Sequence, residues 1–312
     1  MSAHRPPRAS LADSASVDRP RRTSAQPAVR TLLLQLDTSQ HPSVFDRIVA
    51  LDGGADEVMS YGGITDDTVR DLVHGTIFTR GPRDLHRTAI FIGGTEMVLG
   101  ERLLAAVQNT FFGPMRVSVM LDSNGSNTTA AAAVARLRQA AGDVAGRRAV
   151  VTAATGPVGL RAAGLLAQAG AEVVLTSRKT VDAAVLATLQ ERFGGRVRAV
   201  TLSDSARASA VLEGAELLLN AGPAGVTLVP RAAWTSHRTL RAIADLNAVP
   251  PAGIEGVEAA DEGAEREGVK TFGALGVGKL KMKLHKACIA RLFERNDVVL
   301  DAESIAELAA GM

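Results

Sequence analysis

The stretch Arg147–Gly164, RRAVVTAATGPVGLRAAG, constrains the fold of this chain more than any other. Its apolar run Ala149–Val151 is typical of a buried parallel strand, and apolar residues recur at helical spacing from Leu160 onward. Between them lies a glycine-rich turn, Ala154–Gly159. Such a turn can direct unpaired amides and the positive end of the helix dipole at a pyrophosphate. The stretch therefore predicts either the opening of a dinucleotide-binding fold or an ordinary strand-to-helix connection.

Two glycines of this turn have distinct expected roles. Gly156 lets the backbone approach the phosphates, and Gly159 lets the helix pack close to the strand. The motif G-x-G-x-x-G has a glycine where this chain has Ala154, so the geometry of phosphate binding stays open.

The next predicted strand, Glu172–Arg178, favours a particular cofactor. It ends about twenty residues past the turn, where a carboxylate usually binds a free ribose 2′-hydroxyl. This chain has Ser177, Arg178 and Lys179 there, which suit a 2′-phosphate through charge-assisted hydrogen bonds. The alternative is a solvated strand end, where arginine and lysine are common. Together, the turn and the strand favour NADP over NAD.

Composition limits the class of protein. The chain has 312 residues, of which 46% are hydrophobic, so it can bury a sizeable core and fill two domains. Its net charge is +2 and it lacks a basic stripe interleaved with aromatics, so no nucleic-acid partner is expected. No apolar run approaches the roughly 18 residues of a membrane span. The single cysteine, Cys288, excludes an internal disulfide and fits a cytoplasmic location.

The chain divides into four expected parts. Residues 1–30, rich in Ser, Pro, Ala and Arg, are expected to form a disordered tail. Residues 31–126 alternate strand and helix patterns, which predicts an α/β domain with a mostly parallel sheet covered on both faces. Residues 127–272 are interpreted as a Rossmann-type NADP-binding domain, with residues 251–270 as a surface excursion. Residues 273–312 are expected to form helices that close the cleft. The predicted fold class is α/β with two domains.

A polar turn is the candidate for substrate contact. Asp122–Thr129 (DSNGSNTT) follows the predicted strand Val117–Leu121 and precedes a helix predicted over Ala130–Ala141. It is either a polar loop whose Asn127 or Thr128 caps the helix, or a binding turn at the carboxyl end of a strand. The substrate-binding candidates are Asp122, Ser123, Asn124 and Asn127.

Two further strand ends are candidates for cofactor contact. Asn220–Gly225 ends the predicted strand Glu216–Asn220, and Asn247 follows the predicted strand Arg241–Asp245. In a doubly wound sheet, such turns commonly lie near the nicotinamide. Their alternative interpretation is an ordinary strand end stopped by glycine and proline. The candidate residues are Ala221, Gly222, Pro223 and Asn247.

The segment Ala274–Glu294 predicts a helix in which one lysine differs from the others. At about 100° per residue, three lysines share a solvated face: Lys279, Lys283 and Lys286. Lys281 lies opposite them, on an apolar stripe made by Val277, Leu284, Cys288 and Leu292. Lys281 either extends out to solvent or points into a cleft, where it can orient a substrate. His285 is adjacent, but no second ligand stands at metal spacing, so no metal site is predicted.

Eight motifs together resemble one protein family. The chain is similar to the bacterial NADP-dependent methylene-tetrahydromethanopterin dehydrogenases, and in particular to the branch that also accepts methylene-tetrahydrofolate. The resemblance covers about Leu32 to the C-terminus. The motifs begin at Pro42 (PSVFD), Asp52 (DGGAD), Phe91 (FIGG), Phe111 (FFGP), Asp122 (DSNGSNTTAAA), Thr155 (TGPVG), Asn247 (NAVPPAGI) and Gly273 (GALGVGKLKMKLH).

The resemblance implies a fold, a site and a setting. It implies that a pterin substrate binds in the cleft between an α/β domain and a Rossmann domain. It also implies a cytoplasmic homo-oligomer, a trimer being favoured, that serves one-carbon metabolism from formaldehyde. By position, Lys281 matches the active-site lysine. Four residues match the pyrophosphate turn: Thr155, Gly156, Pro157 and Val158. Three match the 2′-phosphate end: Ser177, Arg178 and Lys179.

The implied chemistry needs few catalytic groups. Hydride leaves the methylene carbon for nicotinamide C4 and a methenyl cation remains, so no proton moves and no general base is required. The protein must hold donor and acceptor roughly 3–3.5 Å apart. Lys281 is therefore assigned to orienting the pterin, either by bonding to its carbonyl region or after losing its charge on burial.

Two alternative functions remain open at this point. One is an NADP-dependent dehydrogenase of another substrate, of the shikimate or quinone type. The other is a non-catalytic NADP-binding sensor that uses its basic tail to reach a partner.

Overall fold

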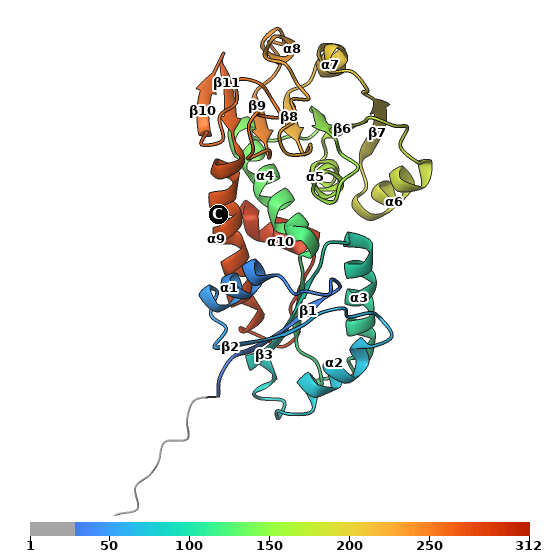
Figure 1. Cartoon of the computed structure of the whole chain (residues 1–312), viewed down its shortest axis with the longest axis vertical. Helices are drawn as coiled ribbons and strands as arrows, with labels where there is room; N and C mark the ends of the chain where they lie inside the picture. The colour runs from blue at the N-terminus through green and yellow to red at the C-terminus, as the bar shows by residue number, and fades with distance from the viewer. Residues whose placement is uncertain (1–28) are drawn as a thin grey trace, which may run out of the picture.

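The alternation of strands and helices produces two separate, mostly parallel sheets, one above the other along the long axis (Figure 1). The computed structural model describes residues 29–312. The predicted α/β fold class is confirmed, whereas the tail predicted for residues 1–30 lies almost entirely outside the described residues. No helix between residues 29 and 312 is long and apolar enough to cross a membrane.

The first sheet has five parallel strands in the order β12-β4-β3-β1-β2. Counted along the chain this is the 2-1-3-4-5 order of doubly wound sheets. Three helices accompany it: α1 (Val44–Asp52), α2 (Val69–Ile77) and α3 (Met97–Thr110). The strands are β1 (Leu32–Asp37), β2 (Glu57–Tyr61), β3 (Thr88–Gly93), β4 (Ser118–Leu121) and β12 (Val299–Leu300).

The edge strand β12 comes from the far end of the chain and was not predicted. It pairs with β4 through only two residues, Val299 and Leu300, too few to produce a strand pattern in the sequence. The Ser118 hydroxyl in β4 strengthens the join by donating to the carbonyl of Arg295 (2.8 Å).

The second sheet has the strand order of a dinucleotide-binding fold. Its seven strands run β10-β11-β9-β8-β5-β6-β7, and all pairs but β10–β11 are parallel. Without β10, the order along the chain is 3-2-1-4-5-6. The strands are β5 (Arg148–Thr152), β6 (Glu172–Ser177), β7 (Arg196–Thr201), β8 (Leu217–Asn220), β9 (Ala242–Asp245), β10 (Glu262–Arg266) and β11 (Val269–Phe272). The helices are α5 (Pro157–Gln168), α6 (Ala183–Phe193), α7 (Ala208–Leu212) and α8 (Arg231–Thr235).

The interpretation of residues 251–270 as a surface excursion was wrong. Ile254 and Val257 are buried against β8 and β9, and β11 extends the sheet beside β9. The acidic residues of this segment indicated an exposed loop, but one of them, Asp261, is buried. Its carboxylate accepts two hydrogen bonds from Arg266 (2.6 and 2.7 Å).

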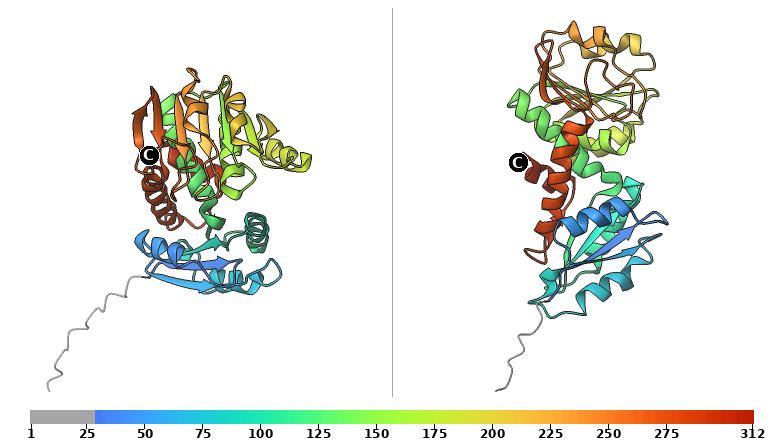
Figure 2. Two further views of the ribbon diagram at one scale, coloured as in Figure 1. Left: turned by 45° about the horizontal axis from the view of Figure 1, so that its top comes forward. Right: turned by 60° about the vertical axis from the view of Figure 1, so that its left-hand side comes forward.

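Three helices pack between the two sheets and join them. They are α4 (Ser126–Ala141), α9 (Ala274–Leu292) and α10 (Ala302–Ala310). Helix α9 contacts β4 of the first sheet and β9 of the second, and Figure 2 shows it running from one sheet to the other. Helix α4 begins at Ser126, one turn before the predicted start at Ala130. The division of the chain after residues 30, 126 and 272 stays a prediction.

A cluster of four charged residues spans the two sheets. Glu101 on α3 forms ion pairs with Arg161 on α5 and with Arg192 on α6 (2.8 Å), and Arg192 also pairs with Glu303 on α10 (2.7 Å). The Arg161 side chain is only 5% exposed and its Nε donates to Asn127 (2.9 Å). Glu101 is therefore the acid from the first sheet that neutralises a buried cation of the second.

Replacing Glu101 with alanine is expected to destabilise the protein. The change leaves the Arg161 guanidinium buried without its carboxylate, which costs about 3 kcal/mol of unfolding free energy. Urea unfolding followed by circular dichroism measures it. Asp66→Asn is the matched control, because it breaks the exposed Arg102–Asp66 pair and should have little effect. Equal midpoints for the Glu101→Ala variant and wild type would contradict the expectation.

Candidate functional site

A cavity of about 390 Å³ opens at the carboxyl ends of β1, β3 and β4. In the order 2-1-3-4-5, the crevice beside β1 and β3 is where ligands bind in doubly wound sheets. We call it the first-sheet cavity. Its lining residues are Asp37, Ser39, His41, Ser43, Phe45, Asp46, Gly94, Thr95, Asn124, Gly125, Thr129 and Lys281.

Buried polar contacts fix the start of α1 over this cavity. Asp37, at the end of β1, accepts hydrogen bonds from the amides of Ser39 (2.8 Å) and Ser43 (3.2 Å). Ser43 in turn caps α1 by accepting from the amide of Asp46 (3.2 Å). As a result, Phe45 and Asp46 lie in the cavity wall, and Phe45 remains half-exposed.

Lys281 reaches the first-sheet cavity from α9. Its Nζ lies 4.2 Å from the centroid of the Phe45 ring and 3.4 Å from Nδ1 of His285. Of the two alternatives for Lys281, the side chain therefore lies in a cavity. The other three lysines point outward: Lys279 pairs with Glu262, Lys286 pairs with Asp52, and Lys283 is exposed.

His285 is a neutral, fully buried neighbour of Lys281. Its ring stacks on Phe91 with centroids 5.6 Å apart. Burial lowers the pKa of His285 to about 4, and the Lys281 ammonium contributes to the lowering. A neutral imidazole can accept a hydrogen bond from Lys281 at Nδ1, so this histidine orients the lysine without adding charge.

The cavity carries two groups with displaced pKa values. Burial raises the pKa of the Asp46 carboxyl to about 6, and the nearby charges of Asp122 and Asp37 add to the rise. Burial also lowers the pKa of the Lys281 ammonium, while Asp122 and Asp46 oppose the change. Displaced pKa values in a cavity are typical of functional sites.

The predicted substrate turn serves mainly to start α4. Asp122 is buried and its carboxylate accepts from the amides of Asn127 (2.9 Å) and Thr128 (3.0 Å). Ser123 and Asn127 are buried as well, so of the four candidates in this turn only Asn124 lines the cavity. Asp122, Ser123 and Asn127 hold the turn that carries Asn124, and a direct contact of any of the four with substrate stays a prediction.

A second cavity, of about 910 Å³, lies at the carboxyl ends of β5, β6 and β8. This is the switch point of the 3-2-1-4-5-6 order. We call it the second-sheet cavity. Seven predicted cofactor residues line it: Thr155, Gly156, Ser177, Arg178, Lys179, Ala221 and Pro223.

The glycine-rich turn is strained at an unexpected residue. Ala153 has φ +49°, whereas Ala154, at the position of the missing glycine, does not have a positive φ. Gly159 is required, because a Cβ there would lie 2.7 Å from Cα of Ala154. A Cβ at Gly156 would meet nothing within 4 Å, so this backbone faces open space. Pro157 is the first residue of α5, followed by Val158.

The end of β6 presents free cations. Arg178 and Lys179 are exposed, and neither forms an ion pair with any residue from 29 to 312. The Ser177 hydroxyl accepts from the amide of Lys179 (3.4 Å). These three polar groups are therefore available to an anion in the second-sheet cavity.

Two predicted cofactor residues have structural roles. Gly222 is needed because a Cβ there would lie 2.6 Å from the Leu228 side chain. Asn247 accepts from the amides of Gly225 (3.3 Å) and Val249 (3.0 Å) and holds two loops together. Neither lines the second-sheet cavity, so cofactor contact for both stays a prediction.

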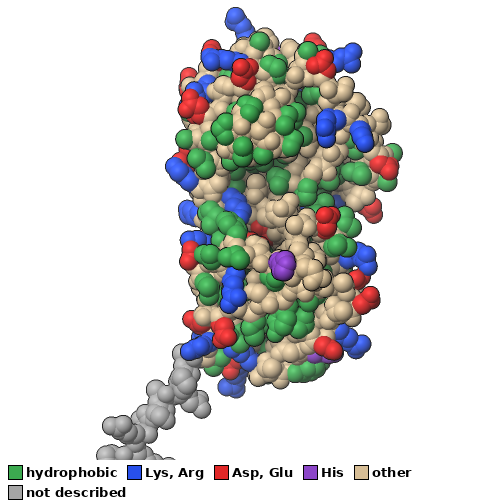
Figure 3. Space-filling model, viewed as in Figure 1, with side chains coloured by type: hydrophobic (Ala, Val, Ile, Leu, Met, Phe, Trp, Pro, Cys, Tyr) green, Lys and Arg blue, Asp and Glu red, His purple; other side chains and the backbone are tan. Residues whose placement is uncertain are grey.

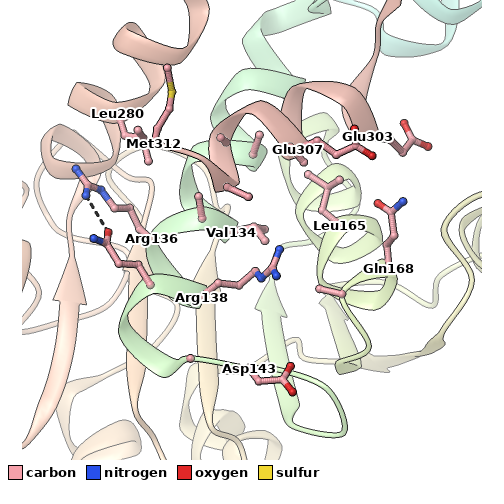
Figure 4. Close-up of a pocket in the computed structure, with 18 residues that line it drawn as sticks. Val134, Arg136, Arg138, Asp143, Leu165, Gln168, Leu280, Glu303, Glu307 and Met312 are labelled. Atoms are coloured by element: carbon pink, nitrogen blue, oxygen red, sulfur yellow. Dashed lines mark hydrogen bonds between the residues drawn. The ribbon is translucent and has the colours of Figure 1, made fainter.

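A third cavity, of about 810 Å³, lies between α4, α5 and α10 (Figure 4). Charges of both signs, including Arg138 and Glu307, surround it, and none of the predicted site residues lines it. In the described part of the chain, no three His, Cys, Asp or Glu residues are grouped so as to hold a metal ion.

The sequence reasoning missed Phe45, Asp46 and Thr129 as individual site residues. Phe45 and Asp46 belong to the motif PSVFD, but their patterns are those of an ordinary amphipathic helix start. Their position after β1 was the available indication, and it becomes informative only once the strand order is known.

Replacing Ala153 with glycine is expected to stabilise the protein by about 1 kcal/mol, because a left-handed conformation is costly for alanine and not for glycine. Thermal unfolding of the unliganded protein measures the change. The matched control is Ala154→Gly, at the neighbouring residue without a positive φ, which should destabilise. A lower stability for Ala153→Gly would show that this turn is not strained.

Comparison with known proteins identifies relatives over nearly the whole chain. A family profile described as "Methylene-tetrahydromethanopterin dehydrogenase, N-terminal" matches residues 44–124. The bifunctional protein MdtA of Methylorubrum extorquens is 52% identical over 91% of this chain and 99% of its own length. The NAD(P)-dependent methylenetetrahydromethanopterin dehydrogenase of the same organism is 33% identical over 90% of this chain and 98% of its own length.

A solved structure shares only the fold. Ornithine carbamoyltransferase from Pyrococcus furiosus has a TM-score of 0.55 at 13% identity, over 84% of each chain. The sequence relatives decide the family: the chain belongs to the methylene-tetrahydromethanopterin dehydrogenases.

Proposed function

We propose that this protein transfers a hydride from a methylene-tetrahydropterin to NADP and releases the methenyl form. The observation that carries the proposal is the pair of cavities at the switch points of the two sheets. The second-sheet cavity, with its glycine turn and free cations, fits NADP. The first-sheet cavity, with Phe45 and Lys281, fits a flat polar ring. The substrate is methylene-tetrahydromethanopterin, methylene-tetrahydrofolate or both.

Bound NADP would supply the acceptor carbon, and the chain supplies geometry. The amino end of α5 and the open space beside the Gly156 backbone suit the pyrophosphate, and Arg178 and Lys179 suit the 2′-phosphate. No proton moves in the reaction, so positioning and electrostatics are the contributions required of the protein.

Lys281 is the proposed active-site lysine. It is half-buried, held between Phe45 and neutral His285, and surrounded by the carboxylates Asp46 and Asp122. A positive lysine would by itself disfavour the cation that forms on the substrate, and these negative charges offset the charge of the lysine. An ammonium here can donate a hydrogen bond to the pterin carbonyl.

The proposed assembly is a homo-oligomer, a trimer being favoured. Hydrophobic side chains gather over α1 in Figure 3, and three of them are exposed on one face: Val44, Ile48 and Leu51. Such a stripe favours a covered surface. A cytoplasmic role in formaldehyde oxidation is part of the same proposal and is supported by family membership. Light scattering on the purified protein determines the number of subunits.

An absorbance assay tests the proposed reaction. Protein, NADP and methylene-tetrahydromethanopterin or methylene-tetrahydrofolate are mixed, and formation of NADPH and the methenyl product is followed. A sensor would bind NADP without turnover, and a shikimate- or quinone-type dehydrogenase would turn over only those substrates. Initial rates with the two pterins at equal concentration give the preference.

Replacing Lys281 with alanine is expected to lower turnover at least tenfold and leave NADP binding nearly intact, because the lysine lies in the first-sheet cavity. Lys283→Ala is the matched control on the same helix, since Lys283 is exposed and outside both cavities. Steady-state kinetics and NADP titration measure both effects. Unchanged turnover in Lys281→Ala would remove the lysine from the proposed site.

Reversing the charge at Arg178 tests the cofactor assignment. Arg178→Glu should weaken NADP binding by about 1–3 kcal/mol, the magnitude for a lost bond between charged groups, and leave NAD binding little changed. Calorimetric titration with each cofactor measures the difference. Equal losses for NADP and NAD would contradict a 2′-phosphate site at the end of β6.

A further inference from the structure

The first-sheet cavity contains one carboxylate that the fold does not use. Asp37 accepts two backbone amides and Asp122 accepts two more, so both are committed to holding loops in place. Asp46 also lines the cavity, but its carboxylate accepts no backbone hydrogen bond from any residue between 29 and 312. No ion pair within residues 29–312 includes Asp46.

The surroundings of Asp46 leave its negative charge short of partners. Asp46 is partly buried, the nearby negative charges of Asp122 and Asp37 oppose its ionisation, and the charge of Lys281 favours it. This shortage of favourable contacts raises the pKa of the Asp46 carboxyl to about 6. At neutral pH the carboxyl is still mostly ionised. Such a carboxylate gains from any ligand that brings hydrogen-bond donors.

We infer that Asp46 and Lys281 together recognise the 2-amino-4-oxo edge of the pterin ring, with Asp46 accepting from the 2-amino group and N3–H and Lys281 donating to the 4-oxo oxygen. This inference rests on the proposed pterin substrate. Asp46 is thereby a specificity-determining residue for the reaction.

The chemistry of the two groups matches the edge in order and in charge. Along this edge of a reduced pterin, two adjacent N–H donors stand beside one carbonyl acceptor. A carboxylate is an acceptor for paired donors, and an ammonium is a donor only. Asp46 and Lys281 approach the cavity from α1 and α9, and each is near enough to influence the charge of the other.

This recognition makes pterin affinity depend on pH. Protonation of Asp46 below about pH 6 removes an acceptor, so kcat/KM for the pterin should fall as the pH drops through this value. The other titratable groups near Asp46 are Asp37 from β1, Asp122 after β4 and Lys281 from α9, and His41 also lines the cavity. A variant at Asp46 is therefore needed to assign the pH effect.

The test combines a variant with an altered substrate. Wild type, Asp46→Asn and Asp46→Ala are assayed with methylene-tetrahydrofolate and with its 2-desamino-2-methyl analogue, which lacks the 2-amino donors. Asp52→Asn is the control, because Asp52 lies on the same helix, pairs with Lys286 and does not line the cavity. Binding of NADP to each variant verifies that the protein is folded.

Four results are expected together. In wild type and Asp52→Asn, the analogue raises KM about 10- to 100-fold with little change in kcat, as for lost hydrogen bonds to a charged group. The Asp46 variants raise KM by a similar factor, and the analogue then causes no further loss. The fall of kcat/KM below pH 6 disappears in Asp46→Asn. In wild type and Asp52→Asn, but not in the Asp46 variants, the difference in KM between the two substrates narrows below pH 6.

Contrary results separate the two proposals. A full analogue penalty in Asp46→Asn, or in wild type at pH 5, overturns the recognition role. A fall in kcat at constant KM overturns it too, as does a fall of kcat/KM below pH 6 that is retained in Asp46→Asn. Absence of turnover by wild type with either methylene-pterin overturns the proposed function itself.

Discussion

The packing of α9 between the two sheets is the constraint on which the site depends. This helix contacts β4 on one side and β9 on the other, so it fixes how the two switch points sit relative to each other. It also carries Lys281 into the first-sheet cavity and buries His285 behind it. The Glu101–Arg161–Arg192–Glu303 cluster restrains the same arrangement from the α3 side. Reaction geometry thus follows from helix packing and a few buried charges.

Much of the fold follows from local pattern, because parallel strands and amphipathic helices leave regular periods in the sequence. The position of Lys281 on the apolar stripe follows from helix geometry alone. The strand β12 could not be predicted, because two residues carry no period. Residues 251–270 were misinterpreted for a related reason: a buried carboxylate such as Asp261 resembles a surface residue until its arginine partner is placed.

The site was predictable only in part. The turn from Thr155 and the cations at Arg178 and Lys179 are local features, and the structure brings them to one cavity. Phe45 and Asp46 required knowledge of the strand order, because they become site residues through the position of β1 beside β3. Asp122 has a structural role that its polarity alone did not indicate, because its carboxylate accepts the hydrogen bonds that start α4, and its contact with substrate stays a prediction.

The late strand β12 has a consequence for biosynthesis. Because β4 pairs with residues near the end of the chain, the first sheet keeps one edge open while the second is being translated. The first sheet can therefore be completed only after the strands of the second sheet have been translated. In such a protein, the segment that is synthesised first reaches its folded form only when a segment synthesised much later pairs with it.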